Sequence, residues 1–319
     1  MDEVKRDEAA MATYVGAERD LLDAHHVRGE VRDLQTAGGP VHMIDTGGDG
    51  PPVVLVSGGG ATGATWGPLL AHLHGYRAIA VDRPGFGLTP PADLGTTPLG
   101  DVAVRFLDDV LDALQLRSAV LLGNSMGSWW ITRYALARPD RVHGMVHVGC
   151  PALLLTTSAP LPMRVMGVRG LGRLLLAMQR PSPKNARMQL RMSGDPLGET
   201  AADRAMVEVL VAMQRLPYCR SAWLDLLHAT VGPRGARRGM SITPDDLRTI
   251  RTPTLFVWGE RDAFGAPAVG GRAVQLMPTA TIATVPYGHA PWVSDAAAVA
   301  TPIRGWLAAR ASPSVVADG

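Results

Sequence analysis

A serine between two glycines is the first residue of this chain whose setting points to chemistry. Ser125 lies in residues 121–130, LLGNSMGSWW, where an apolar run ends and a helix-like run begins. Glycines two residues before and two residues after a serine permit the tight strand-to-helix turn that presents a nucleophilic hydroxyl above a sheet. A serine hydroxyl is a poor nucleophile near neutral pH, so it needs a base, and the base needs an orienting group.

An acid and a histidine follow the serine in the order that such a turn requires. Asp262 comes just after the strand-like run TPTLFVWG, and His289 just after TATIATVP. We expect His289 to accept the proton of Ser125 and pass it to the leaving group, while Asp262 holds the imidazole in the working tautomer. Taken singly, each could be an ordinary loop residue or helix cap. Glu260, with Asp295 behind it, is a less favoured acid.

A glycine-rich segment, VSGGGATGATW at residues 56–66, follows another strand-like run. The oxyanion of a tetrahedral intermediate needs two N–H donors. Met126, at the expected helix start, supplies one, and we assign the other to Gly59, with Gly60 as the alternative. No phosphate-binding lysine follows these glycines and no GxGxxG is present, so no nucleotide site is expected. We expect no cofactor and no metal.

The elements that must position these residues alternate between strand and helix. The alternation covers residues 28–150 and resumes over 241–311, which predicts an α/β fold with a mostly parallel eight-stranded sheet flanked by helices. Such sheets bind ligands outside the carboxyl ends of their strands. Ser125, Asp262 and His289 all fall at such ends.

Residues 151–240 interrupt the alternation. Strand signals vanish there, arginine, methionine and leucine dominate, and prolines break the run, so we predict an all-helical insertion. Residues 1–27 read as a charged helical leader and residues 312–319 as a disordered tail. The leader has no apolar core of a signal peptide, and no run is long enough to cross a bilayer, so we expect a cytoplasmic protein without a membrane span.

Composition excludes some classes of partner. The formal net charge is +2, from 31 basic and 29 acidic residues that look scattered, so no nucleic-acid partner is expected. Cys150 and Cys219 have no metal-ligand spacing and read as reduced, packed thiols. A homodimer is possible on these grounds, and the sequence does not determine the oligomeric state.

Five motifs together resemble the α/β-hydrolase family: SGGGATGATW, DRPGFGLT, GNSMG, WGERD and GHAPW occur in family order and spacing. The resemblance implies that fold, a triad of Ser125, His289 and Asp262, and a helical cap at residues 151–240. The dehalogenase and epoxide hydrolase branches have aspartate at the nucleophile position, so the serine argues against both.

Within the family, the glycines at 58–60 and Asn124 are similar to the C–C bond hydrolases of aromatic ring-cleavage pathways. The chain departs from them at Ser57, where many have histidine, and at Ala290, where tryptophan often follows the catalytic histidine. Their substrate-gripping cap arginine could correspond to Arg204 or Arg191. Simple esterases and lactonases of the family share most of the same motifs.

Cap and core together should enclose an apolar cleft for a small hydrophobic substrate. The candidate substrate contacts are Gly60, Asn124, Trp129, Arg204 and Trp292, and Phe86, Trp66 and the cap methionines are further candidates for its lining. The alternative is that most of these aromatic and methionine side chains are core. Arg83 could be a plain turn residue.

The function expected from these features is a serine hydrolase that cleaves a hydrophobic ester or lactone through an acyl-enzyme. A C–C bond hydrolase acting on a β-diketone is the alternative, and a non-catalytic ligand-binding scaffold is a weaker one, since fold by itself does not determine function. The natural substrate, and the choice between hydrolysis and acyl transfer, stay open.

Overall fold

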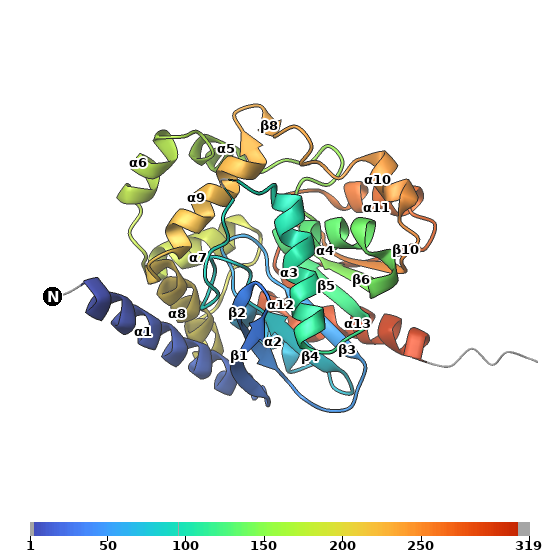
Figure 1. Cartoon of the computed structure of the whole chain (residues 1–319), viewed down its shortest axis with the longest axis horizontal. Coiled ribbons are helices and arrows are strands. Elements are labelled where there is room, and N and C mark those ends of the chain that lie inside the picture. The colour runs from blue at the N-terminus through green and yellow to red at the C-terminus, as the bar shows by residue number, and fades with distance from the viewer. Residues whose placement is uncertain (1–2, 95, 312–319) are drawn as a thin grey trace, which may run out of the picture.

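The computed structural model describes residues 3–94 and 96–311 and contains one large mixed sheet (Figure 1). Eight strands lie in the order β1-β2-β4-β3-β5-β6-β9-β10, and all neighbours from β4 to β10 pair in parallel. The prediction of a mostly parallel eight-stranded sheet is confirmed. The strands are β1 (Glu30–Thr36), β2 (Gly39–Asp45), β3 (Pro52–Val56), β4 (Arg77–Val81), β5 (Ala119–Asn124), β6 (Val142–Val148), β9 (Thr254–Gly259) and β10 (Ala280–Val285).

The strands follow the hydrophobic pattern of the sequence. The central strands β3 and β5 are short runs of valine and leucine that are almost entirely buried, as expected where helices cover both faces of a parallel sheet. At one edge, β1 and β2 form an antiparallel hairpin in which Thr36 pairs with Gly39. β1 is largely exposed, while β2 is buried against β4.

Helices cover both faces of the sheet. Gly123 of β5 faces α4, because a Cβ there would lie 2.6 Å from the amide nitrogen of Ser128. Gly144 of β6, which pairs with Val120, faces the ring of Trp306 in α13. Positions three apart on a strand face opposite ways, so α4 and α13 lie on opposite faces. The helices outside the insertion are α2 (Gly67–Leu70), α3 (Leu99–Ala113), α4 (Met126–Ala137), α10 (Pro244–Thr249), α11 (Pro267–Leu276), α12 (Pro291–Ser294) and α13 (Ala296–Ala311), with 3₁₀ turns at Gly63–Trp66 and Pro139–Arg141.

The helical segment that ends the described chain is divided into two helices. The chain forms α12, leaves the helical conformation at Asp295 and resumes as α13. The Asp295 carboxylate accepts a hydrogen bond from the amide of Ala298 at 2.9 Å, so it caps the second helix. An aspartate that satisfies a free amide at a helix start explains the break in an otherwise apolar helical run.

The chain between β6 and β9 forms five further helices above the carboxyl ends of the strands (Figure 1). It also contains a short hairpin of β7 (Val231–Gly232) and β8 (Gly235–Ala236), so the expectation of an all-helical insertion is wrong in this detail. The intervening Pro-Arg pair and flanking glycines favour a turn over a helix. The helices are α5 (Leu161–Met166), α6 (Leu171–Met178), α7 (Pro183–Met192), α8 (Ala201–Arg215) and α9 (Cys219–Thr230).

The amino-terminal segment is helical, as expected, and forms α1 (Glu3–Ala24). It lies along α8 of the insertion at the lower left of Figure 1. Its inner side is buried and includes Tyr14, Leu21 and the carboxylate of Glu18. Glu18 accepts from Nε2 of His42 on β2 at 2.9 Å, so the helix is tied to the sheet by a buried ion pair. The predicted tail at 312–319 lies outside the described residues.

Candidate active site

Ser125 occupies the sharp turn between β5 and α4. Its backbone has φ 51° and ψ −113°, a strained conformation for a residue with a side chain. A Cβ on Gly127 would lie 2.0 Å from the carbonyl oxygen of Val56, and one on Gly123 would also overlap the start of α4. The two glycines around the serine are therefore required by close packing of helix against strand, and the packing holds the strained turn in place.

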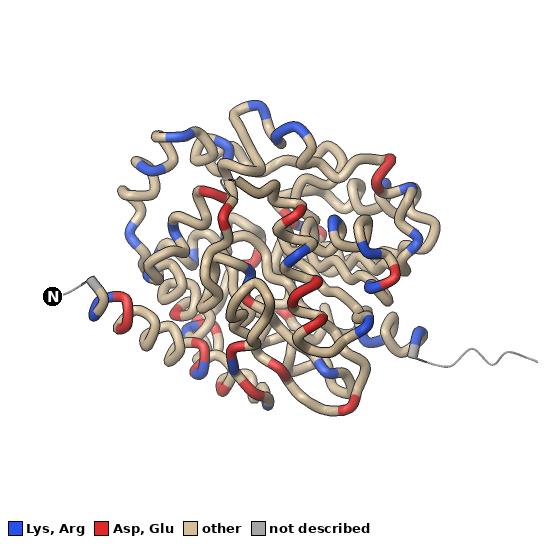
Figure 2. Tube along the Cα trace, in the orientation of Figure 1, with Lys and Arg blue, Asp and Glu red and all other residues tan. Residues whose placement is uncertain are grey.

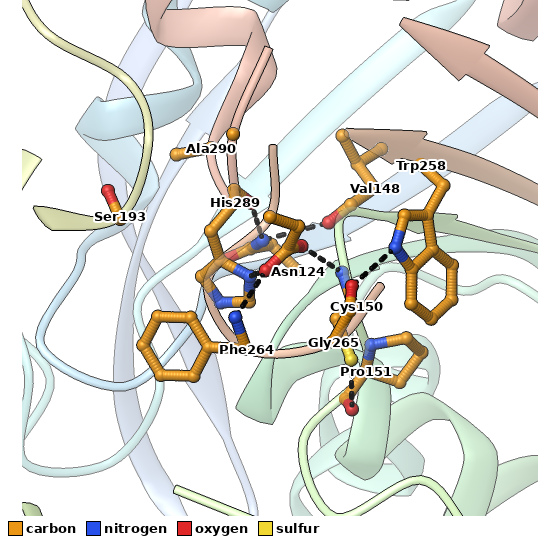
Figure 3. A network of polar contacts seen from close by, with 12 residues as sticks. Asn124, Val148, Cys150, Pro151, Ser193, Trp258, Phe264, Gly265, His289 and Ala290 are labelled. Atoms are coloured by element: carbon orange, nitrogen blue, oxygen red, sulfur yellow. Dashed lines mark hydrogen bonds and ion pairs between the residues drawn. The ribbon is translucent and has the colours of Figure 1, made fainter. Parts of the chain in front are cut away.

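His289 and Asp262 meet as the sequence predicts. Nδ1 of His289 lies 3.0 and 2.9 Å from the two carboxylate oxygens of Asp262. The carboxylate also accepts from the amides of Cys150 at 2.7 Å and Phe264 at 2.8 Å, and its side chain is fully buried. The ring of Phe264 stacks on the imidazole with centroids 4.0 Å apart (Figure 3). With so many partners the carboxylate has one position, and it fixes the orientation of the ring.

The Nε2 atom of His289 is buried and has no hydrogen-bond partner among the described residues. His289 and Ser125 line the same cavity. The structure thus brings all three predicted triad residues to one place, with Nε2 available for a proton. No hydrogen bond joins Ser125 to His289 in this structure, and such bonds often tighten only when substrate binds.

Asn124 supports the histidine from the side of the strand. Its side-chain nitrogen donates to the carbonyl oxygens of Val148 at 2.8 Å and His289 at 2.9 Å (Figure 3). Asn124 lines the cavity, but its donors are used within the protein. Its contacts are those of a residue that holds the His289 backbone, which differs from the expected substrate contact.

A carboxylate of the insertion accepts hydrogen bonds from the loop that carries His289. Asp195, which is fully buried, accepts from the amides of Gly288 at 2.8 Å and Ala290 at 2.7 Å, the two neighbours of the histidine. The amide of His289 itself donates to the carbonyl oxygen of Ser193 at 2.9 Å. A Cβ on Gly288 would lie 2.3 Å from that same oxygen. The segment 193–195 is therefore interlocked with the histidine loop, a contact that no sequence motif signalled.

The glycine-rich loop after β3 is held from both ends. The buried guanidinium of Arg83 donates from Nε to the carbonyl oxygen of Ser57 at 2.8 Å and from Nη2 to that of Gly58 at 2.7 Å. Burial lowers the pKa of Arg83 to about 9. Asp82 accepts from the amide of Gly63 at 2.6 Å. Arg83 is thus a loop-positioning residue and not a plain turn residue, and it fixes the peptide that precedes Gly59.

Both predicted oxyanion donors lie at the same cavity as the serine. Gly59 and Met126 line the same cavity as Ser125. Met126 is the first residue of α4, so its amide has no acceptor within the helix. Gly60, the alternative donor, has φ 72° and is not among the residues lining the cavity. Gly59 is therefore the better placed of the two.

The cavity itself is a hollow of about 680 Å³, its open mouth included. No Lys, Arg, Asp or Glu of the described residues lines it. Its walls away from Ser125 are mainly apolar and come largely from the insertion, with Leu153, Met163, Trp223, Leu226, Val231 and Phe264. Such a space favours a substrate whose bulk is neutral and hydrophobic.

Several expected lining residues lie elsewhere. Trp66 and Trp292 are buried and stack on each other with centroids 4.1 Å apart, and the indole N–H of Trp292 donates to a backbone oxygen at 2.7 Å. Trp129 is fully buried and its indole N–H donates to the carbonyl oxygen of Met240. The guanidinium of Arg204 lies on the exposed side of α8 and donates to the carbonyl oxygen of Glu199. These side chains complete the core or cap helices and do not line the cavity.

Two smaller expectations are corrected in the same way. Phe86 packs under the guanidinium of Arg83 at 4.5 Å and borders a different, smaller pocket. Arg191, the alternative cap arginine, is exposed on α7 and does not line the cavity. Among the cap methionines only Met163 lines it within the described residues. Both cysteines are free and buried, as expected.

Comparison with known proteins decides the family. A family model described as the alpha/beta hydrolase family matches residues 53–301. The chain belongs to the α/β-hydrolase family. The resemblance inferred from the five motifs and the prediction of an α/β-hydrolase enzyme are confirmed.

Relatives within the family carry more than one activity in their names. The chain is 28% identical over 252 residues to a 2-hydroxy-6-oxononadienedioate/2-hydroxy-6-oxononatrienedioate hydrolase of Cupriavidus pinatubonensis, covering 75% of this chain and 80% of that protein. It is also 28% identical over 280 residues to a pimeloyl-[acyl-carrier protein] methyl ester esterase of Shewanella sp. (strain MR-7), covering 84% and 95%. Among solved structures, carboxylesterase CesB from Bacillus subtilis superposes with a TM-score of 0.72 at 21% identity, covering 94% of this chain and 99% of that one, which shows the shared fold.

Proposed function

We propose that this α/β-hydrolase cleaves a neutral, hydrophobic carboxylic ester or lactone through an acyl-enzyme on Ser125. The observation that supports this most is the content of one cavity: a serine on a strained turn, an unpartnered imidazole nitrogen of His289, two backbone donors, and walls that are mainly apolar and carry no Lys, Arg, Asp or Glu of the described residues. An ester carbonyl seated there has a nucleophile, a base and an oxyanion site around it.

The proposed reaction has two steps, acylation of Ser125 and hydrolysis of the acyl-enzyme, and the same groups act in both. Ser125 Oγ attacks the carbonyl carbon while Nε2 of His289 takes its proton, and the oxyanion accepts hydrogen bonds from the amides of Gly59 and Met126. The imidazolium then protonates the leaving alkoxide, which departs and leaves the acyl-enzyme. Water attacks the acyl carbon, with its proton passing to Nε2, and Ser125 leaves with that proton to free the acid.

The support around the histidine suits this cycle. Asp262 holds Nδ1 protonated by two close contacts, so that Nε2 is the accepting nitrogen, and its charge stabilises the imidazolium. Stacking against Phe264 restricts ring rotation. In this way the imidazole keeps one orientation through both proton transfers.

Hydrolysis of a ring-cleavage diketone is the second candidate, because the Cupriavidus relative is named for such a substrate. The name of that substrate describes a dicarboxylate. Neither Lys nor Arg of the described residues lines the cavity of this chain, so a dianionic substrate would be desolvated without a counter-charge. This comparison favours a neutral ester or, within the second candidate, a diketone without a second carboxylate.

The test is turnover of a p-nitrophenyl ester series, acetyl to decanoyl, by wild type and Ser125→Ala. We expect turnover by wild type and a loss of roughly three orders of magnitude or more in kcat for the variant. Equal thermal denaturation midpoints would show that the variant is folded. Activity of Ser125→Ala within severalfold of wild type would remove Ser125 as the nucleophile. Inactive wild type on every ester, with turnover of a neutral ring-cleavage diketone, would favour the second candidate.

A further inference from the structure

The outer edge of the insertion carries several large apolar side chains that are exposed. We define the cap rim as α5, α6 and the β7–β8 hairpin, which follow one another along the upper left and top of Figure 1. α5 packs against both α6 and β7, and Arg164 of α5 donates to the carbonyl oxygen of Pro233 in the hairpin. The cap rim is therefore one connected surface.

One face of α6 carries the apolar part of this surface. Leu171, Leu174 and Met178 are 41%, 60% and 74% exposed, and their spacing of three and four residues places them in one stripe. Leu161 at the start of α5 is 64% exposed. The carboxyl end of α6 is fastened, because Arg220 of α9 donates to the carbonyl oxygens of Leu176 and Gln179. The exposed stripe thus belongs to an anchored helix.

The charge of the cap rim is of one sign. Residues 141–194 and 226–244 contain no aspartate or glutamate. Figure 2 shows blue without red along the same upper-left edge. Although the chain as a whole is nearly neutral, these two stretches hold 11 of its 31 basic residues and none of its 29 acidic residues, which corrects the expectation of scattered charge. The exposed arginines of the cap rim and its flanks are Arg169, Arg173, Arg180, Arg234, Arg237 and Arg238.

Two of these arginines have acidic neighbours, so the positive charge of the cap rim comes mainly from the other four. Arg169 and Arg173 border a groove together with Asp93 and Asp225, which partly offset their charge. Arg180 lies just beyond the end of α6, and Arg234, Arg237 and Arg238 lie in or beside the hairpin. An apolar stripe on α6 is thus flanked by cations toward both ends of the cap rim.

We propose that the cap rim docks on an anionic lipid surface. In this arrangement Leu171, Leu174 and Met178 enter the boundary between headgroups and acyl chains, and the arginines contact lipid phosphates, as in amphipathic helices that lie on membranes. No helix in the described part of the chain is long and apolar enough to span a bilayer, so the docking is peripheral.

Charge complementarity favours this partner over two others. In a two-fold dimer the same patch faces itself, so cations would face cations. A nucleic acid would satisfy the arginines but would leave the exposed leucines and Met178 without an apolar partner. An anionic bilayer satisfies both parts of the cap rim.

The cap rim also lies beside the cavity. Met163 of α5 and Val231 of β7 line it, so two elements of the cap rim form part of the wall of the cavity that contains Ser125. The docking would let an apolar substrate pass from the lipid phase into the cavity. This identifies the substrate class as an ester that partitions into membranes. This inference about the substrate rests on the proposed ester hydrolysis.

The test is flotation of the full chain with vesicles of phosphatidylcholine and of phosphatidylcholine with phosphatidylglycerol. We expect binding to the anionic vesicles that weakens as salt is raised. The double variant Leu174→Ser, Met178→Ser should lose roughly tenfold or more in partitioning, since two buried apolar side chains are removed from the contact. Val31→Ser, a residue 43% exposed on β1, is the matched control and should bind as wild type does.

Each other outcome bears on the proposal. Unaltered thermal midpoints and turnover of p-nitrophenyl acetate would show that the double variant is folded. Failure of wild type to bind any vesicle would overturn the docking while leaving ester hydrolysis intact. Dissociation of a wild-type dimer by the double variant, or binding of duplex DNA without binding of vesicles, would assign the surface to another partner. Vesicle binding by an enzyme that cleaves no ester would retain the docking and remove the proposed function.

Discussion

The cavity has two walls that are built in different ways. The core wall, which we define as Gly59, Ser125, Met126 and His289, consists largely of backbone and of the His289 ring, which hydrogen bonds to Asp262 hold in place. The cap wall, which we define as Met163, Trp223, Leu226 and Val231, consists of apolar side chains from the insertion. Hydrogen bonds fix atoms in place, whereas apolar contacts mainly fill volume. For the proposed hydrolysis we therefore expect the core wall to determine the reaction and the cap wall to determine which substrates fit.

Residues 193–195 are the exception to this division. They belong to the insertion, yet Asp195 and the carbonyl oxygen of Ser193 hold the backbone on both sides of His289. The insertion therefore has one segment tied to the chemistry and another, the cap rim, that faces outward. The predictions below separate these roles, beginning with the largest expected effect.

Gly127→Ala should destabilise the protein more than any other substitution considered below. The new Cβ would lie 2.0 Å from the carbonyl oxygen of Val56, backbone that cannot move without separating α4 from β3. We expect a loss of about 3 kcal/mol or more in unfolding free energy, measured by chemical denaturation. Gly100→Ala in α3 is the control, because nothing lies within 4 Å of its new Cβ, and it should be neutral or stabilising by up to about 1 kcal/mol. Equal stabilities of the two variants would contradict the packing argument.

His42 supports the fold behind the core wall and should make stability depend on pH. Burial by itself lowers the pKa of His42, but the carboxylates of Glu18 and Asp82 outweigh it and raise that pKa to about 10. An unfolded histidine titrates near about 6.5, so the folded chain holds an extra proton between those values. This contribution is fully present below about pH 6.5 and is lost as pH rises toward 10, with a slope of at most about 1.4 kcal/mol per pH unit.

Denaturation at pH 7, 8.5 and 10 checks this prediction. His42→Gln should be less stable at pH 7 and should lose most of the decline seen in wild type. His143→Gln, an exposed histidine on β6, is the control and should keep it. An equal change with pH in wild type and His42→Gln would show that the Glu18–His42 pair does not hold an extra proton.

Asp195→Asn tests whether the insertion positions His289, the proposed catalytic base. An amide can accept from only one of the two backbone N–H groups at Gly288 and Ala290, because its nitrogen donates. We expect kcat/KM to fall by roughly 10- to 100-fold, mainly through kcat, since small displacements of a catalytic group are costly. Asp195 and His289 also interact electrostatically, so removing the carboxylate should change the pH dependence of kcat/KM.

The matched control is Glu199→Gln, a carboxylate-to-amide change in the same connection, at an exposed side chain. It should leave rate and profile nearly unchanged, as expected for a surface ion pair. If Asp195→Asn lowers the thermal midpoint but leaves kcat and the pH profile as in wild type, Asp195 is structural and does not position the base.

The sheet could be predicted from the sequence, and so could the proximity of Ser125, Asp262 and His289. This was possible because the predicted triad residues come directly after strand-like runs that are clearly apolar, such as TPTLFVWG. The supporting residues could not be found in this way. Asp195 lies 94 positions before His289, as the difference of their numbers shows, inside an insertion without motifs, and only the tertiary fold joins them.

Side-chain type also failed to separate lining from core. Trp129 and Trp223 are both tryptophans on helices, yet Trp129 is fully buried beneath Met240 while Trp223 borders the cavity. Large aromatic residues satisfy either setting, so composition does not distinguish them. A net charge of +2 similarly concealed the cap rim, because summing over the chain removes the segregation of charge.

Trp223→Ala, finally, tests the cap wall with the smallest expected effect. Its ring lies so close to Gly59 that a Cβ there would be 2.6 Å from it, so truncation enlarges the cavity next to the oxyanion site. We expect kcat/KM for short esters to fall severalfold, mainly through KM, and the chain-length optimum to move to longer acyl groups. Trp306→Ala, which removes a tryptophan that packs on Gly144 away from the cavity, should cost stability but keep the optimum. A loss in kcat at every chain length for Trp223→Ala would instead assign this residue to the core wall. In that case α9 would contribute both to the reaction and to the selection of substrates.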